Sequence, residues 1–128
     1  MARTLLTLAI GTLVAVLPAA AHHSFAAYYF ENQSITIEGM VQAFELRSPH
    51  AILRFSAPDE AGRTQTYAAE WGNPRRLGRD GITATTLKPG DLVRVTGSPG
   101  RVASEYKIHL KGIQRPADGW SWGGRRRR

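Results

Sequence analysis

Polar and apolar residues alternate in five short runs along the chain, which is typical of β-strands with one face in a core. In the second run Leu53 and Phe55 fall on one face, and in the third Tyr67, Ala69 and Trp71 do. Turn-forming segments rich in glycine, proline and aspartate separate most of the runs. The pattern therefore predicts strands at residues 34–46, 51–57, 63–71, 92–97 and 106–113.

Two interruptions refine this prediction. Gly39 lies in the middle of the long first run, after which Phe44 and Leu46 crowd the second face, so we expect a bulge or sharp coil near this glycine. Asn73-Pro74 is a favourable N-cap and first position for a short helix, expected over residues 75–78. Three strands, a short helix and two strands is the order of an all-β, five-stranded OB-like Greek-key barrel with the helix between strands 3 and 4.

The first 21 residues have the pattern of a cleavable secretory signal peptide. Arg3 precedes an uncharged apolar stretch that is too short to span a membrane, and Ala19-Ala20-Ala21 supplies small residues for cleavage after Ala21. A retained membrane anchor and cleavage after Ala20 are the alternatives. We therefore expect a periplasmic protein with a signal peptide at 1–21, a barrel at 22–115 and a disordered tail rich in tryptophan and arginine at 116–128.

Composition adds two limits. Cysteine is absent, which excludes disulfides, cysteine nucleophiles and cysteine-based zinc sites. The formal net charge is +7, but Arg3 and the four terminal arginines supply five of those charges, and a nucleic-acid partner is therefore not expected. The sequence contains no nucleophile-elbow, zinc-protease, Walker or dinucleotide-binding motif, which favours a binding or accessory module over an enzyme.

Four segments together resemble a family of small exported bacterial proteins known only as a domain of unknown function. They are Ala21-His22-His23-Ser24-Phe25, Ser48-Pro49-His50, Glu70-Trp71-Gly72-Asn73-Pro74 and Leu87-Lys88-Pro89-Gly90-Asp91. The resemblance covers about residues 21–115 and implies a periplasmic OB-like barrel without an established activity. The chain departs from the family at Ser48, where asparagine is usual, and in its C-terminal tail.

The histidines suggest a transition-metal site. Cleavage after Ala21 would give His22 a free α-amine beside its imidazole, and the two nitrogens can chelate one ion. Together with His23 and His50 they would favour Cu(II) or Zn(II). The alternative is that His22 and His23 only aid signal processing or packing, while His50 caps its turn. His109 is left out, because it is expected to face outward between two lysines whose charges repel a cation.

Two further binding hypotheses remain. An envelope glycan or envelope protein could contact one barrel face through Arg54, Tyr67, Trp71, Arg75 and Arg76, although the alternation favours the core for the two aromatic residues. The tail could touch an anionic membrane surface, or it could simply be solvated. The tail residues concerned are Trp120, Trp122, Arg125, Arg126, Arg127 and Arg128.

Overall fold

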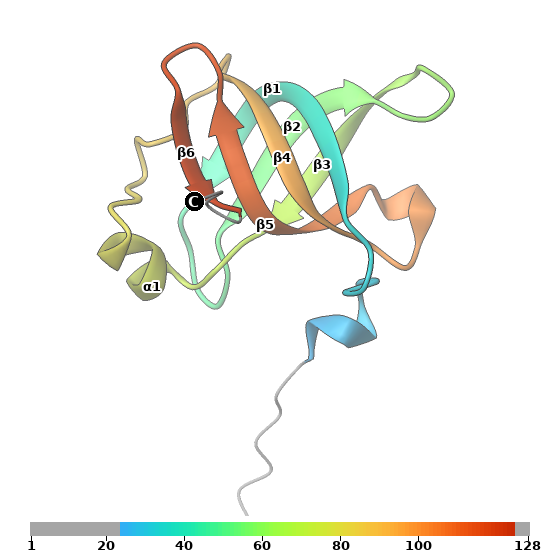
Figure 1. Cartoon of the computed structure of the whole chain (residues 1–128), viewed down its shortest axis with the longest axis horizontal. Coiled ribbons are helices and arrows are strands. Elements are labelled where there is room, and N and C mark those ends of the chain that lie inside the picture. Colours follow the sequence, from blue (N-terminus) through green and yellow to red (C-terminus); the bar gives the residue numbers. More distant parts are fainter. Residues whose placement is uncertain (1–23, 125–128) are drawn as a thin grey trace, which may run out of the picture.

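The computed structural model describes residues 24–124, which form a small β-barrel (Figure 1). The sheet order is β3-β2-β1-β4-β5-β6, and a parallel pairing of β3 with β5 closes the first five strands into the barrel. This confirms the predicted five-stranded barrel with one short helix between strands 3 and 4. The elements are η1 (Phe25–Ala27), β1 (Ile35–Glu45), β2 (Ile52–Pro58), β3 (Thr64–Glu70), α1 (Pro74–Arg79), β4 (Leu92–Pro99), η2 (Ala103–Glu105), β5 (Lys107–Arg115) and β6 (Trp120–Gly123).

The long strand β1 serves two neighbours, pairing with β4 along its first half and with β2 along its second. The register shifts between Val41 and Ala43, so the bulge lies slightly beyond its predicted place at Gly39. Gly39 marks a close approach instead: a Cβ there would lie 2.4 Å from the backbone oxygen of Ser56. After the bulge the inward-facing positions change parity, and Phe44 then packs against the core.

The predicted inner faces form the core. Leu53, Phe55, Tyr67, Ala69 and Trp71 are all buried, as the alternation of β2 and β3 requires. Other buried side chains come from β4, β5 and the segment after α1: Val93, Val95, Ile108, Leu110, Ile113, Ile82 and Leu87.

The helix α1 forms as the sequence predicts and covers one end of the barrel. The side chain of Asn73 accepts a hydrogen bond from the Arg76 backbone N–H at 2.9 Å, and Pro74 occupies the first turn. Leu77 points into the core and is fully buried. In the part of the chain that the structure describes, no helix has the length and apolar character needed to cross a membrane.

The expected disorder from residue 116 is wrong for the segment up to Gly124, because β6 pairs with β5 in antiparallel register. The Trp122 ring meets the buried Trp71 edge to face, with centroids 5.0 Å apart. Its indole N–H donates to Asp80 Oδ2 at 2.9 Å. Residues 125–128 lie outside the described residues.

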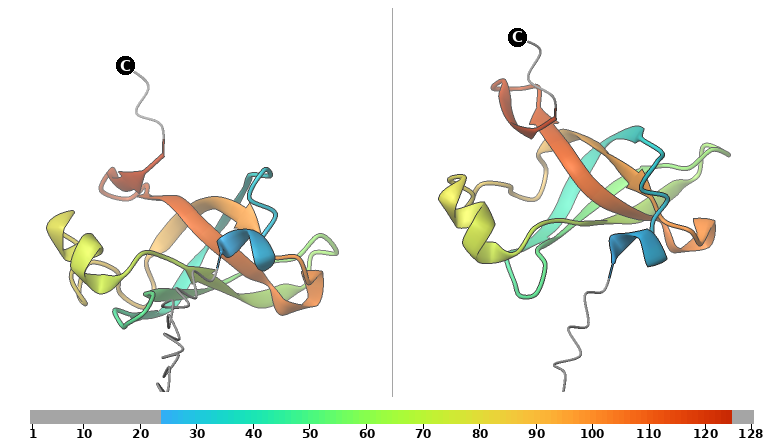
Figure 2. Two further views of the ribbon diagram at one scale, coloured as in Figure 1. Left: turned by 90° about the horizontal axis from the view of Figure 1, so that it is seen from below. Right: turned by 60° about the horizontal axis from the view of Figure 1, so that its bottom comes forward.

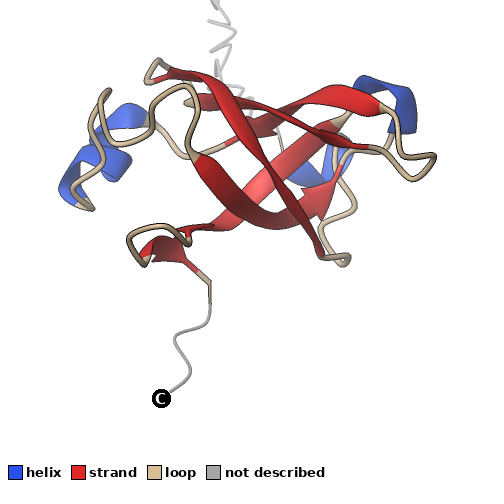
Figure 3. Cartoon of the chain, turned by 90° about the horizontal axis from the view of Figure 1, so that it is seen from above, coloured by secondary structure: helices blue, strands red, loops and turns tan. Residues whose placement is uncertain are grey.

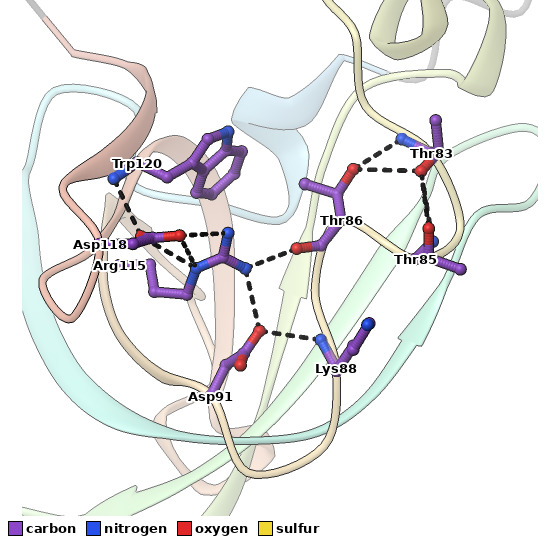
Figure 4. Close-up of polar contacts among 8 residues, drawn as sticks. All are labelled: Thr83, Thr85, Thr86, Lys88, Asp91, Arg115, Asp118 and Trp120. Atoms are coloured by element: carbon purple, nitrogen blue, oxygen red, sulfur yellow. Dashed lines mark hydrogen bonds and ion pairs between the residues drawn. The ribbon is translucent and has the colours of Figure 1, made fainter.

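Arg115 at the end of β5 links the loop before β6 to the rest of the barrel through hydrogen bonds and ion pairs (Figure 4). Its guanidinium donates to the Thr86 carbonyl at 2.6 Å and to Asp91 Oδ2 at 3.0 Å, and it pairs with Asp118 at 2.9 Å. It also lies 5.3 Å from the centre of the Trp120 ring. One side chain thus joins the Leu87–Asp91 turn to the loop before β6.

The two ends of the barrel differ. α1 and the neighbouring β6 lie at one end, whereas the β2–β3 turn and η2 lie at the other (Figures 2 and 3). The N-terminal segment with η1 lies outside the barrel, below the strands in Figure 1. It is fixed there by a bridge between Tyr29 and Gly100 and by a hydrogen bond from the Phe30 N–H to the Pro99 carbonyl at 2.9 Å.

Candidate functional site

A group of titratable and aromatic side chains lies where the N-terminal segment crosses the seam between β3 and β5. We call it the histidine–glutamate cluster. Glu70 ends β3 and stands beside His109 of β5 in the parallel register, while His50 comes from the loop before β2. The remaining members come from the N-terminal segment and β5. The full set is Phe25, Tyr29, Glu31, His50, Glu70, His109 and Lys111.

The carboxylate of Glu70 joins two other members of the cluster. One oxygen lies 2.7 Å from His50 Nδ1, and the other accepts a hydrogen bond from the Tyr29 hydroxyl at 2.6 Å. Tyr29 is almost completely buried. Burial, reinforced by the hydrogen bond to Glu70, raises the pKa of Tyr29 far above its ordinary value, so the phenol stays a donor and fixes the carboxylate.

Glu31 pairs with His109 in the same way as Glu70 pairs with His50. Its carboxylate lies 2.7 Å from His109 Nδ1 and 2.6 Å from Lys111 Nζ. Burial alone would raise the pKa of Glu31, but the hydrogen bonds from Lys111 and His109 outweigh it and lower the pKa. Burial lowers the pKa of His109 below its ordinary value, against the opposing effect of Glu31. At neutral pH this pair is therefore a carboxylate and a neutral imidazole.

Phe25 of η1 lies between the two imidazoles. Its ring stacks on His109 with centroids 3.6 Å apart and planes 6° apart, and its centroid is 5.0 Å from that of His50. Ser24 caps η1 by accepting a hydrogen bond from the Ala26 N–H at 3.3 Å. The residue after the His22-His23-Ser24 segment is thus seated directly against both histidines of the cluster.

The hydrogen bonds fix which ring nitrogen is free. A carboxylate only accepts, so a neutral histidine bonded to it carries its proton on Nδ1 and leaves the lone pair on Nε2. In both His50 and His109 it is Nδ1 that faces a carboxylate, so this tautomer applies to either ring in its neutral form. A histidine that donates Nδ1–H to a carboxylate and presents Nε2 is the usual form of a metal-binding histidine. Within residues 24–124, however, no group of three or more potential ligands is close enough to hold an ion.

Comparison with known proteins shows which family the chain belongs to. The chain belongs to a family of unknown function, DUF6152. The family model matches residues 11–108, a span that includes three of the four histidines of the sequence and ends just before His109. No curated protein matches the chain. The resemblance drawn from the sequence motifs, to an uncharacterised domain family, is therefore confirmed.

The structure describes only one of the three predicted metal ligands, His50, and places it in the cluster. His22 and His23 lie outside the described residues. The expectation for His109 needs correction, since its side chain is only 14 % exposed and its neighbours are Phe25 and Glu31. The two lysines thought to repel a cation are themselves paired, Lys111 with Glu31 and Lys107 with Glu105.

The five residues proposed for glycan or protein contact are not brought together. Tyr67 and Trp71 point into the core, where Trp71 Nε1 is buried without a hydrogen-bond partner. Arg54 lies on the outer face and pairs with Glu45 at 3.2 Å, whereas Arg75 and Arg76 are exposed on α1. One ligand cannot contact an inner and an outer face of the same sheet, so this set does not form a site.

The two tail tryptophans also have partners within the molecule. Trp122 packs on Trp71, and Trp120 lies beneath the Arg115 guanidinium. Both residues are partly buried and pack against the core. Insertion of these rings into a membrane surface would break those contacts, which counts against the proposed role of Trp120 and Trp122. The four arginines at 125–128 lie outside the described residues.

Proposed function

We propose that the protein is exported to the periplasm and binds one transition-metal ion, Cu(II) or Zn(II), through His22, His23 and His50. The observation that carries the proposal is the hydrogen bond between His50 Nδ1 and Glu70, which leaves Nε2 of His50 as the lone-pair nitrogen. Neutral imidazole nitrogens suit both metals, and an all-nitrogen site favours Cu(II).

The position of Phe25 supports the inclusion of His22 and His23 as the other two ligands. Its ring lies 5.0 Å from the His50 ring, and His22 precedes it by three residues. Three residues of chain span about 10 Å at most, so both N-terminal histidines are tethered within reach of His50. His50 is also the more accessible imidazole, since its side chain is 31 % exposed against 14 % for His109.

The free amine of His22 depends on cleavage after Ala21. Its pKa of about 7.7–8.0 means that metal binding must displace a proton, so affinity should fall in acid. Mass spectrometry of the protein purified from the periplasm tests the first step. Recovery of a chain that retains residues 1–21 would contradict cleavage after Ala21, and recovery from the cytoplasm only would contradict export.

Isothermal titration with CuCl₂ and ZnCl₂ tests the second step. We expect the chain that begins at His22 to bind one equivalent more tightly than a chain carrying an extra N-terminal alanine. Replacing His50→Ala should weaken binding further, and Glu70→Gln should weaken it by about 10- to 100-fold, the usual effect of losing a carboxylate behind a ligating histidine.

His109→Asn is the matched control, because it removes the second imidazole of the cluster and keeps a side-chain donor for Glu31. Its metal affinity should equal that of the unchanged protein. Equal affinity of the His22 chain and its alanine-extended form would overturn the proposal. Equal losses for His50→Ala and His109→Asn would overturn the assignment of His50.

A further inference from the structure

The end of the barrel opposite α1 is hollowed into an open groove of about 740 Å³ between the β2–β3 turn and η2. Figure 2 shows these two segments side by side, away from α1. Ligand sites in proteins typically have volumes of about 300–1,000 Å³ and often lie at the mouth of a barrel. We call this hollow the barrel mouth.

The floor of the barrel mouth is aromatic and apolar. Ile35, Ile37 and Tyr106 pack against the core beneath it, and Tyr67 and Tyr106 meet edge to face with ring centroids 5.4 Å apart. Tyr106 has φ 49° and ψ 47°, a left-handed conformation that disfavours every residue with a side chain. Glycine would adopt it without strain, yet the position holds a large ring that faces the groove.

The walls are held in place before any ligand arrives. Asp59 is only 8 % exposed and accepts hydrogen bonds from the Arg63 N–H at 2.9 Å and the Gln65 amide at 3.0 Å. On the other side, Glu105 pairs with Lys107 at 2.8 Å. A preformed wall reduces the ordering cost of binding.

The chemistry of the lining indicates an uncharged ligand. Its charged residues are two acids, Asp59 and Glu60, and two bases, Arg63 and Lys107, so their charges cancel. Tyrosine hydroxyls and a serine lie beside apolar surface along the groove. A sugar ring matches this mixture, because it presents C–H groups to aromatic rings and hydroxyls to polar side chains.

We propose that the barrel mouth binds a neutral oligosaccharide. The site is distinct from the metal site, since none of its lining residues belongs to the histidine–glutamate cluster. It also differs from the set predicted from the sequence: only Tyr67 is common to both, and it serves as part of the floor. The contacts that select the sugar come from Tyr106 and from Val102, which is 52 % exposed on the rim.

Titration of the ¹⁵N-labelled protein with chitotetraose, cellotetraose and maltotetraose tests this site by NMR. We expect amide shifts concentrated in residues 59–63 and 100–107, with a dissociation constant below about 5 mM for at least one sugar. Tyr106→Gly removes the ring while relieving the backbone strain, so the fold should be retained. Val102→Asp alters the rim alone. Each variant should weaken binding about tenfold.

Met40→Ala is the matched control, since it removes an equally exposed apolar side chain on the outside of β1. Its affinity for the sugar should equal that of the unchanged protein. Absence of shifts with all three sugars, shifts outside the barrel mouth, or affinities unaffected by both groove variants would overturn the proposal. Binding of a proline decapeptide, tested in parallel, to the groove without any sugar binding would assign the site to peptides and overturn it as well.

Discussion

Arg115 should contribute more to stability than a surface arginine usually does. Its side chain is 19 % exposed and donates to the Thr86 carbonyl at 2.6 Å, a charged hydrogen bond worth about 1.5–3 kcal/mol. The pair with Asp118 adds little, because the exposed Asp118 carboxylate is screened by water. Arg115→Met keeps the stem over Trp120 but removes these bonds, so we expect a loss of about 2–3 kcal/mol.

Urea unfolding followed by tryptophan fluorescence measures this loss, and Arg94→Met is the control. Arg94 lies on the neighbouring strand β4 and forms an ion pair of 2.7 Å with Glu38 in which both side chains are about half exposed. Its replacement should cost at most about 0.5 kcal/mol. Equal midpoints for the two variants would refute the role given to Arg115 in fastening β6.

Three further predictions concern other parts of the barrel. Gly97→Ala should destabilise the protein by about 3 kcal/mol or more in urea unfolding, because the new Cβ would clash with the His109 carbonyl oxygen. Gly78→Ala is its control: the position lies on the open surface of α1, so the added methyl group should stabilise the protein by up to about 1 kcal/mol. Asn73→Ala should cost about 1 kcal/mol in the same assay through loss of the helix cap, and an unchanged midpoint would exclude that role. Burial lowers the pKa of His109 in the folded protein, so this histidine binds a proton more readily in the unfolded chain. The free energy of unfolding should therefore be highest above about pH 6.5 and decline toward pH 5. The His109→Asn variant should show a smaller decline between these pH values.

Structural features that depend only on residues adjacent in the sequence could be predicted. The inner faces of β2 and β3 follow from strict alternation, and the cap formed by Asn73 follows from the residues around it. Gly39 predicted a bulge nearby, and the register shift between Val41 and Ala43 lies close to it; Gly39 itself permits a close approach to Ser56. A glycine in a strand indicates an irregularity nearby, and its kind depends on the neighbouring strand.

The sixth strand could not be predicted in this way. Its four residues are too few to show a periodicity, and glycine and charged residues surround them. Its stability comes instead from partners distant in the sequence, since Trp122 meets Trp71 and Asp80, and Arg115 reaches Asp91. Composition alone favoured disorder because it carries no information on such contacts.

The environment of His109 was missed for a related reason. Its neighbours along β5 are two lysines, and a strand read by itself places all three side chains in solvent. The carboxylate that pairs with it, Glu31, comes from the other end of the chain. The same segment brings Phe25 against its ring. Electrostatic reasoning from sequence neighbours fails here because a distant segment supplies the opposite charge.

The N-terminal segment links the two proposed sites. Phe25 and Tyr29 belong to the histidine–glutamate cluster, while the Tyr28 carbonyl accepts a hydrogen bond from the Arg101 N–H at 2.9 Å in the loop that leads to η2. The Arg101 side chain also donates to the Ala26 carbonyl at 2.9 Å. One wall of the barrel mouth therefore rests on the segment that would carry the metal-binding amine. Because two ligands that stabilise one shared segment favour each other's binding, metal and sugar should bind with positive coupling if both sites are occupied.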